Sequence, residues 1–259
     1  MDFALPARPV RMSLLSGRGH YDQVIRAVRG ARTSVWIATA NLKELLVEDT
    51  RATARARARF HSVLAVLDGL ASQGVELRIL HASAPSGPFR SSFDRRPRLV
   101  AGGLELRQCP RVHLKTVLVD GRLCYLGSAN WTGAGLGAKG EDRRNFELGL
   151  LTDDEDIIDQ VQALYEHIWT GAACRRCKLR DSGCEAPIDV VLGTAGPARP
   201  TRQSPVPKAS HNSKSPVPKA SRKAEAPVPK ASRKAEAPVP KASRTQAPVP
   251  KASLPRRRA

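Results

Sequence analysis

The stretch that decides the fold reads His113-Leu114-Lys115-Thr116-Val117-Leu118-Val119-Asp120, and Gly127-Ser128-Ala129-Asn130 follows after six intervening residues. The apolar runs on either side of Asp120-Gly121 predict a β-hairpin with strands at residues 112–120 and 123–126. On a strand, residues two apart point to the same side, so the imidazole of His113 and the ammonium of Lys115 lie together. The hairpin brings Ser128 and Asn130 alongside as hydrogen-bond donors, which indicates a site that meets a phosphate group.

Helical and strand patterns alternate around this hairpin, as in a domain of the α/β class. Helices are predicted at residues 21–32, 42–73 and 153–169, and further strands at residues 34–42, 75–80, 104–107 and 145–151. Residues 82–103 are rich in Ser, Pro, Gly and Arg and are interpreted as a long loop.

The quoted stretch fills every defined position of the signature H-x-K-x4-D-x6-G-S-x-N and therefore resembles the phospholipase D superfamily. The resemblance covers about residues 19–169 and is weaker away from the signature. It implies a mixed sheet flanked by helices and a phosphodiesterase activity. The expected organisation is an N-terminal segment at 1–18, a phospholipase D-like catalytic domain at 19–170, a Cys-bearing segment at 171–190 and a tail at 191–259.

The resemblance also implies a two-step displacement at phosphorus that needs no metal. His113 would attack and form a phosphohistidine, while a second histidine protonates the leaving oxygen. The groups that neutralise and orient the non-bridging oxygens would be Lys115, Ser128 and Asn130. Asp120 would organise the site, although an ordinary turn residue before Gly121 has the same pattern. Glu147 stands where family members often carry a glutamate hydrogen-bonded to a catalytic histidine, and a solvated strand position explains it nearly as well.

The signature occurs once, and none of the other five histidines begins a second H-x-K pattern. The chain therefore supplies half of a two-histidine site. The simplest completion is a symmetric homodimer in which His113 of each copy faces the other across the two-fold axis. Single-motif bacterial nucleases of the superfamily work in this way. A separate partner subunit is the alternative.

Three cysteines and a histidine lie near the end of the last predicted helix: His167, Cys174, Cys177 and Cys184. Three thiolates and an imidazole can hold zinc tetrahedrally, and such a zinc would be structural. An iron–sulfur cluster is the second interpretation, with Cys109, Cys124 or a partner providing the fourth thiolate. The spacing matches no standard four-ligand pattern, and a core-facing His167 is the alternative without a metal.

The net charge of +19 is concentrated in the tail. Residues 201–259 hold 15 Lys or Arg against 2 Glu, contain no aromatic residue and repeat Pro-Val-Pro-Lys-Ala-Ser five times. This composition predicts a disordered, extended basic arm, with a solvated spacer as the alternative. Such an arm favours a partner with regular negative charge, nucleic acid before an anionic membrane surface.

The substrate class is inferred from charge, because the fold does not choose it. A nuclease is the leading interpretation, supported by the tail and by arginines at positions 51, 55, 57, 59, 90, 95, 96 and 98. A phospholipase D or phosphatidyltransferase is the runner-up, and a non-catalytic nucleic-acid-binding protein is the third interpretation. Residues 1–19 carry no apolar run of the signal-peptide type, and the cysteine number is odd, so a cytoplasmic protein is expected.

Overall fold

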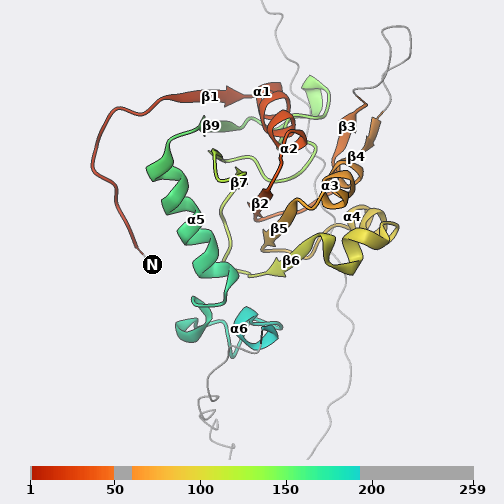
Figure 1. Ribbon diagram of the computed structural model, residues 1–259. Coiled ribbons are helices and arrows are strands. Elements are labelled where there is room, and N and C mark those ends of the chain that lie inside the picture. The colour runs from red at the N-terminus through yellow and green to blue at the C-terminus, as the bar shows by residue number, and fades with distance from the viewer. Residues whose placement is uncertain (1, 50–59, 193–259) are drawn as a thin grey trace, which may run out of the picture. The chain divides into compact units, whose positions relative to one another are not determined.

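The computed structural model describes residues 2–49 and 60–192 (Figure 1). Within these residues, seven strands form one sheet in the order β1-β9-β8-β7-β2-β5-β6. Their bounds are β1 Met12–Ser16, β2 Ser34–Thr39, β5 Glu76–His81, β6 Glu105–Gln108, β7 Thr116–Val119, β8 Leu123–Gly127 and β9 Leu148–Thr152. The basic repeat tail and the arginines at positions 51–59, which carry sequence predictions, lie outside the described residues.

The sheet is parallel on one side and antiparallel on the other. Strand β5 pairs in parallel with both β2 and β6, whereas the pairs β2–β7, β7–β8, β8–β9 and β9–β1 are antiparallel. The C-terminal ends of β2 and β8 therefore lie at the same edge of the sheet as the N-terminal ends of β7 and β9. We call this edge the site edge. The predicted mixed α/β fold is confirmed.

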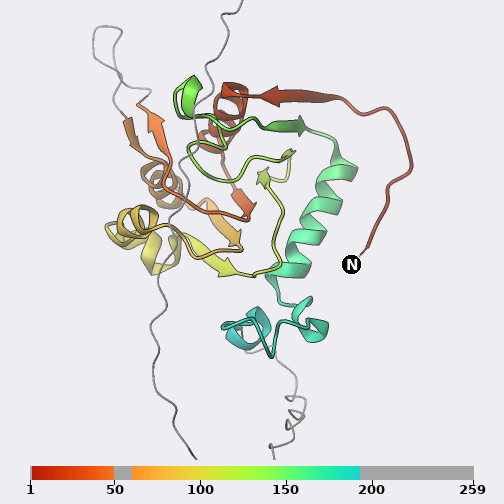
Figure 2. The ribbon, with the colours of Figure 1, turned by 180° about the vertical axis from the view of Figure 1, so that it is seen from behind.

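Helices cover both faces of the sheet (Figures 1 and 2). Helix α5, Glu155–Trp169, packs on one face, where Trp36, Ala38 and Leu118 point. The other face packs against α1 Arg18–His20, η1 Tyr21–Ile25, α2 Arg26–Arg29, α3 Val63–Ser72 and α4 Gly87–Asp94. Here Ile37 and Val117 lie in the main apolar core. Alternate residues of the central strands thus serve opposite faces, as the two-residue period of a strand requires.

Side-chain caps fix where the longer helices begin. Asp154 accepts a hydrogen bond from the backbone N–H of Ile157 at the start of α5, and Ser62 accepts one from Leu64 at the start of α3. The predicted helix at residues 153–169 is confirmed, beginning two residues late because Asp154 is its cap. No helix of the described residues is long and apolar enough to cross a membrane.

The predicted helix at residues 42–73 is wrong in its first part. Strands β3 Leu46–Glu48 and β4 Phe60–Ser62 form a separate two-stranded sheet, and α3 begins only after the Ser62 cap. The helix-favouring composition was overridden by burial, because Leu45 and Val47 are fully enclosed in the core.

The predicted loop at residues 82–103 is also wrong. It contains α4 and a helical turn, η2 Leu99–Gly103, whose side chains Phe89 and Leu99 are fully buried. Ser86 caps α4, and Pro88 sits in its first turn, where its missing N–H costs nothing. Strand β1, which the sequence analysis did not anticipate, pairs along its whole length with β9.

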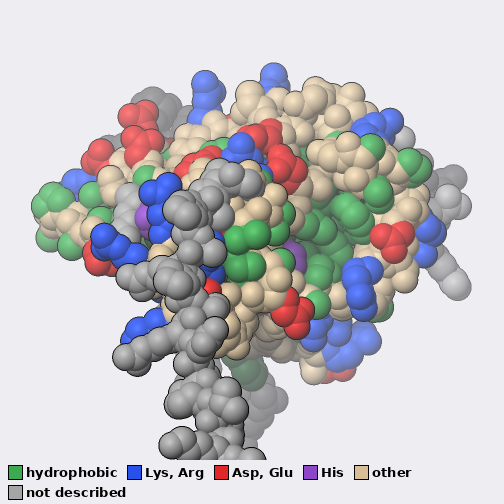
Figure 3. All heavy atoms as spheres, turned by 90° about the horizontal axis from the view of Figure 1, so that it is seen from below, with side chains coloured by type: hydrophobic (Ala, Val, Ile, Leu, Met, Phe, Trp, Pro, Cys, Tyr) green, Lys and Arg blue, Asp and Glu red, His purple; other side chains and the backbone are tan. Residues whose placement is uncertain are grey.

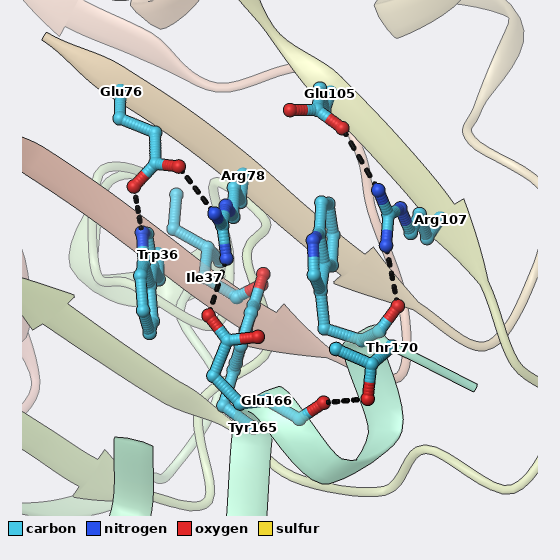
Figure 4. A network of polar contacts seen from close by, with 10 residues as sticks. Trp36, Ile37, Glu76, Arg78, Glu105, Arg107, Tyr165, Glu166 and Thr170 are labelled. Carbon is cyan, nitrogen blue, oxygen red and sulfur yellow. Dashed lines mark hydrogen bonds and ion pairs between the residues drawn. The ribbon is translucent and has the colours of Figure 1, made fainter. Parts of the chain in front are cut away.

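Helix α5 is fixed to the sheet by arginines that stack on aromatic rings (Figure 4). The guanidinium of Arg78 lies 4.6 Å from the ring centroid of Trp36 and 5.3 Å from that of Trp169. Arg107 lies 3.9 Å from the Trp169 centroid, and Arg78 also pairs with Glu166 of α5 at 2.5 Å. Each cation–π contact contributes about 0.5–2 kcal/mol. The C-terminal half of α5 is thereby held over β2, β5 and β6.

Candidate active site

His113 and Lys115 lie at the site edge, in the segment that leads into β7. This strand begins at Thr116, four residues later than predicted, so neither side chain belongs to it. They nevertheless lie side by side: Lys115 Nζ is 3.2 Å from His113 Nε2 and donates to the His113 carbonyl oxygen at 2.8 Å. The expected pairing of imidazole and ammonium is present, made by an extended segment before the strand.

The contact with Lys115 determines which nitrogen of His113 carries the lone pair. An ammonium group only donates, so His113 Nε2 accepts and carries its lone pair, which places the ring proton on Nδ1. Partial burial lowers the pKa of Lys115, and the nearby Glu147 carboxylate acts in the opposite sense. His113 itself is exposed. The arrangement presents a nucleophilic nitrogen at the surface next to a cation.

Ser128 and Glu147 join this site from the residues just after β8 and just before β9. Ser128 Oγ donates to Glu147 Oε2 and accepts from the backbone N–H of Leu148 at 3.2 Å. Asn145 Nδ2 donates to the other carboxylate oxygen, Oε1, at 3.0 Å. The resemblance implied a histidine at this carboxylate, but within the described residues its two oxygens are bonded to Ser128 and Asn145. Asn145 was not identified from the sequence.

Asn130 turns its side-chain oxygen toward the loop that follows β2. Its Oδ1 accepts from the backbone N–H groups of Ala40 and Asn41, both at 3.1 Å, and from Thr39 Oγ1 at 3.3 Å. Asn130 therefore ties the end of β8 to the end of β2. Its role as a donor to phosphate stays a prediction.

A buried Tyr125–His20 pair forms a hydrogen bond to the backbone of the site. Tyr125 Oη lies 3.0 Å from His20 Nδ1, and His20 Nε2 lies 3.2 Å from the Glu147 carbonyl oxygen. A carbonyl only accepts, so Nε2 carries the ring proton and Nδ1 accepts from the tyrosine. Burial raises the pKa of Tyr125 to about 12, so the phenol keeps its proton and donates. The pair positions the backbone of Glu147.

Gly127 and Gly149 make room for that tyrosine. They face each other across β8 and β9, and a Cβ atom on either one would overlap the Tyr125 side chain. The glycine of the G-S-x-N signature thus has a packing reason here. The sequence offered no signal that singled out His20 or Tyr125.

Asp120 lies at the opposite end of β7 from His113. Asp120 follows Thr116 by four positions along the strand, a span of roughly 13 Å. The Asp120 carboxylate accepts backbone N–H bonds from Arg32 at 3.0 Å and Thr33 at 2.8 Å, just before β2, and from Ser34 at 3.0 Å, the first residue of β2. Burial alone would raise the pKa of Asp120, but these N–H groups outweigh burial and lower it. The structure does not bring Asp120 together with His113 and Lys115.

Cys174, Cys177 and Cys184 line one cavity of about 20 Å³, and Cys109 lines it with them. Cys109 follows β6, so a residue far away in sequence joins the cluster. His167 does not line this cavity; it borders a larger one of about 540 Å³, which Cys109 and Arg111 also line. Among residues 2–49 and 60–192, no three His, Cys, Asp or Glu side chains already stand around a metal position.

Comparison with known proteins agrees with the signature. The family model described as "Cardiolipin synthase, PLD-like domain" matches residues 24–169, which is more than half of the chain. The chain therefore belongs to the phospholipase D superfamily. Cardiolipin synthase A from Pseudomonas putida (strain W619) is 33% identical over 144 residues, covering 54% of this chain and 26% of that protein. The chain thus spans about a quarter of the length of this curated relative.

The solved structures to which the chain is similar include three bacterial proteins. NucT from Helicobacter pylori is 19% identical, with a TM-score of 0.44 over 61% of this chain and 94% of that one. Nuc, a phospholipase D family member from Salmonella typhimurium, is 16% identical, with a TM-score of 0.44 over 62% and 95%. Phosphatidylserine synthase from Haemophilus influenzae Rd KW20 is 11% identical, with a TM-score of 0.44 over 61% and 36%.

Proposed function

We propose that this chain is a phosphodiesterase that acts through a covalent phosphohistidine at His113. The observation that carries the proposal is the contact of His113 Nε2 with Lys115 Nζ at 3.2 Å on an exposed edge of the sheet. A lone pair on the imidazole and a cation within one hydrogen bond of it suit attack on an anionic phosphorus centre.

In the first step, His113 Nε2 forms a bond to phosphorus, and the bond from phosphorus to the leaving oxygen breaks. A second histidine gives that oxygen its proton. In the second step, a water molecule or an alcohol attacks phosphorus, loses its proton to the second histidine, and releases Nε2. Lys115 stabilises the non-bridging oxygens in both steps, and Glu147 accepts the hydroxyl proton of Ser128 and holds this side chain at the site.

The second histidine is His113 of another copy of the chain in a symmetric homodimer. Two features of the site edge support this arrangement. His113 and Ser128 are exposed, so a second molecule can reach them. Phe146 is fully exposed and Leu148 is 61% exposed, and these two apolar side chains flank Glu147. Apolar side chains exposed beside polar site residues are typical of a surface that another protein covers.

A mixing experiment tests the shared site. Wild-type chain and His113→Ala chain are co-expressed in varied ratios, and the mixed dimers are purified and assayed. Sharing predicts that activity falls with the square of the wild-type fraction, because a site with one histidine cannot complete both steps. A linear fall, or full activity of a strictly monomeric species, would rule out the shared site.

Nucleic acid is the substrate class that we favour. The support is charge: residues 201–259 contribute +13 of the net +19, and a basic chain binds the regular phosphates of DNA or RNA. A phosphatidyl-transferring activity is the second candidate. It is favoured by the 33% identity to cardiolipin synthase A, which covers a quarter of that protein.

One assay separates the two candidates. The full chain is incubated in the presence of EDTA with single-stranded DNA, double-stranded DNA, RNA, and vesicles of phosphatidylglycerol or phosphatidylcholine, beside the His113→Ala variant. His113-dependent cleavage of a nucleic acid supports the nuclease. Turnover of lipid without cleavage of nucleic acid would transfer the assignment to the lipid candidate, and no turnover of any substrate would leave a nucleic-acid-binding protein.

A further inference from the structure

The cavity lined by four cysteines has the size of a single ion. Its volume is about 20 Å³, and a space of roughly 10–15 Å³ on this measure already holds one water molecule. Three of the thiols come from the segment after α5, and Cys109 comes from the connection between β6 and β7. All four are free thiols that are partly buried. Four soft ligands from two separate parts of the chain thus surround a space for one atom.

The segment that supplies three of these cysteines has little apolar core of its own. In residues 172–192, Ile188 is the one buried hydrophobic side chain, whereas Val190 and Val191 are 50% and 69% exposed. Its regular structure is limited to a single turn, η4 Cys174–Arg176, and the short helix α6 Ile188–Val191. In Figure 1, α6 lies at the lower end of the ribbon. Figure 3 views the molecule from that end and shows hydrophobic side chains between charged ones. So small a segment commonly needs a cross-link or a metal to stay folded.

The surroundings of the cavity suit thiolates. Arg111 and Arg180 both line the cavity, and Arg180 also donates to Asp189 Oδ2. The cluster therefore has hydrogen-bond donors and positive charge to balance several negative sulfurs.

We propose that Cys109, Cys174, Cys177 and Cys184 bind one zinc ion as a structural four-thiolate site. Each thiol releases its proton to water as it binds, and no oxidation or reduction takes place. In the structure described here the four side chains surround the cavity without meeting at one point, and the metal draws them together. An iron–sulfur cluster, which four cysteines also hold, is the alternative that the test distinguishes. Cys109 replaces His167, which does not line the four-cysteine cavity.

The zinc site would connect the segment after α5 to the catalytic loop. Cys109 precedes His113 by four residues, and Val112 between them packs in the same buried cluster as Trp169 and Ile188. Binding of the metal would therefore hold the start of the His113 segment from one side. This proposal does not depend on the phosphodiesterase activity, because its test measures metal.

The test measures zinc in the full-length chain, purified under reducing conditions and dialysed against a weak chelator. Each of the five cysteines is replaced by alanine in turn. We expect one zinc per wild-type chain, and loss of that zinc in the Cys109, Cys174, Cys177 and Cys184 variants. Cys124→Ala is the matched control, because Cys124 lies on β8 in a different buried cluster, and it keeps its zinc, as does His167→Ala.

Replacement of zinc by Co²⁺ in the wild-type chain gives a readout that does not rely on the variants folding. Tetrahedral thiolate coordination predicts visible cobalt absorption together with sulfur-to-metal charge transfer. A metal-free chain that also takes up neither Zn²⁺ nor Co²⁺ after reduction would overturn the proposal. The brown colour and visible absorption of an iron–sulfur cluster, or loss of zinc in His167→Ala with retention in Cys109→Ala, would overturn the identity of the ion or of the ligand set.

Discussion

The two ends of strand β7 carry residues of the same signature, yet they do different things. At the site edge, His113 and Lys115 are in contact with each other, and His113 is exposed. At the far end, Asp120 is occupied by three backbone N–H groups, two from residues just before β2 and one from its first residue. The His113 end of β7 is available to a ligand, whereas the carboxylate at the Asp120 end already accepts hydrogen bonds from the backbone.

The comparison shows that the length of a strand sets the spacing between Lys115 and Asp120 in the H-x-K-x4-D signature. The interval between Lys115 and Asp120 is the length of β7, so a change in that length would move either the reactive pair or the anchor out of place. A fixed spacing therefore reports a rigid element between two groups, and does not by itself indicate that both groups react. The predictions below treat the two ends separately.

The largest expected effect is at the reactive end. His113→Ala removes the nucleophile, and turnover should fall by at least about 1,000-fold, or about 4 kcal/mol of transition-state stabilisation. The free energy of unfolding should change little, because the side chain is exposed. Steady-state kinetics and denaturant unfolding measure the two quantities. His61→Ala on β4 is the control, and a comparable loss of turnover in it would show that histidine removal acts through the fold.

At the Asp120 end of β7, substitutions should lower the free energy of unfolding and have little effect on turnover. Asp120→Ala leaves three N–H groups without their acceptor and places alanine at a φ of +56°, so unfolding should become easier by about 2–4 kcal/mol. Asp120→Asn tolerates that φ and keeps one acceptor oxygen, so its cost should be about 1 kcal/mol. Turnover per folded molecule should be retained in both variants. A stable Asp120→Asn protein without activity would contradict the division between the two ends.

The stabilising contribution of Asp120 should depend on pH. The pKa of Asp120 is lowered in the folded chain, so its ionised form contributes stability above the unfolded-state pKa of about 3.9 and loses that contribution as the pH falls through the folded-state value. The difference in free energy of unfolding between wild type and Asp120→Asn should thus be constant near neutral pH and shrink below about pH 4. Denaturant unfolding of both proteins across this range measures it. A difference that grows on acidification would contradict the assignment.

The smallest expected effect concerns Asn145, which donates a hydrogen bond to the Glu147 carboxylate. Asn145→Ala removes one of the hydrogen bonds to the Glu147 carboxylate and leaves the Ser128 bond in place. One such bond contributes about 0.5–1.5 kcal/mol, so kcat should fall by roughly 3- to 10-fold with an unchanged free energy of unfolding. Glu141→Ala, an exposed acidic position nearby in sequence, should have no effect on kcat.

Local sequence pattern was sufficient for much of the fold. The Asp120-Gly121 turn located the hairpin, and the apolar period with Asp154 at its start located α5. The first half of residues 42–73 was misassigned because its composition favours a helix locally, while Val47 gains more from burial in a small sheet. The helix α4 was missed because Ser, Pro and Gly near position 87 indicate a loop, although Ser86 and Pro88 in fact begin a helix.

The site was predictable to the extent that its residues are close in sequence. His113 and Lys115 are two residues apart, and their contact followed from that spacing. The Tyr125–His20 hydrogen bond joins residues 105 positions apart, and no local pattern in the sequence indicates this contact. Cys109 lines the cysteine cavity, and the sequence had offered it as one of the alternative ligands of an iron–sulfur cluster, while His167 was the predicted partner of the three cysteines for zinc.

The tyrosine that stands between two glycines has a consequence for how this site can change during evolution. Because any side chain at Gly127 or Gly149 would collide with Tyr125, no single substitution at either glycine is neutral while the tyrosine is present. A lineage that first exchanged Tyr125 for a smaller residue would remove this collision at Gly149 and leave His20 without its donor, whereas a Cβ atom at Gly127 would still meet the Leu148 carbonyl oxygen. Substitutions at Tyr125 and Gly149 are therefore coupled.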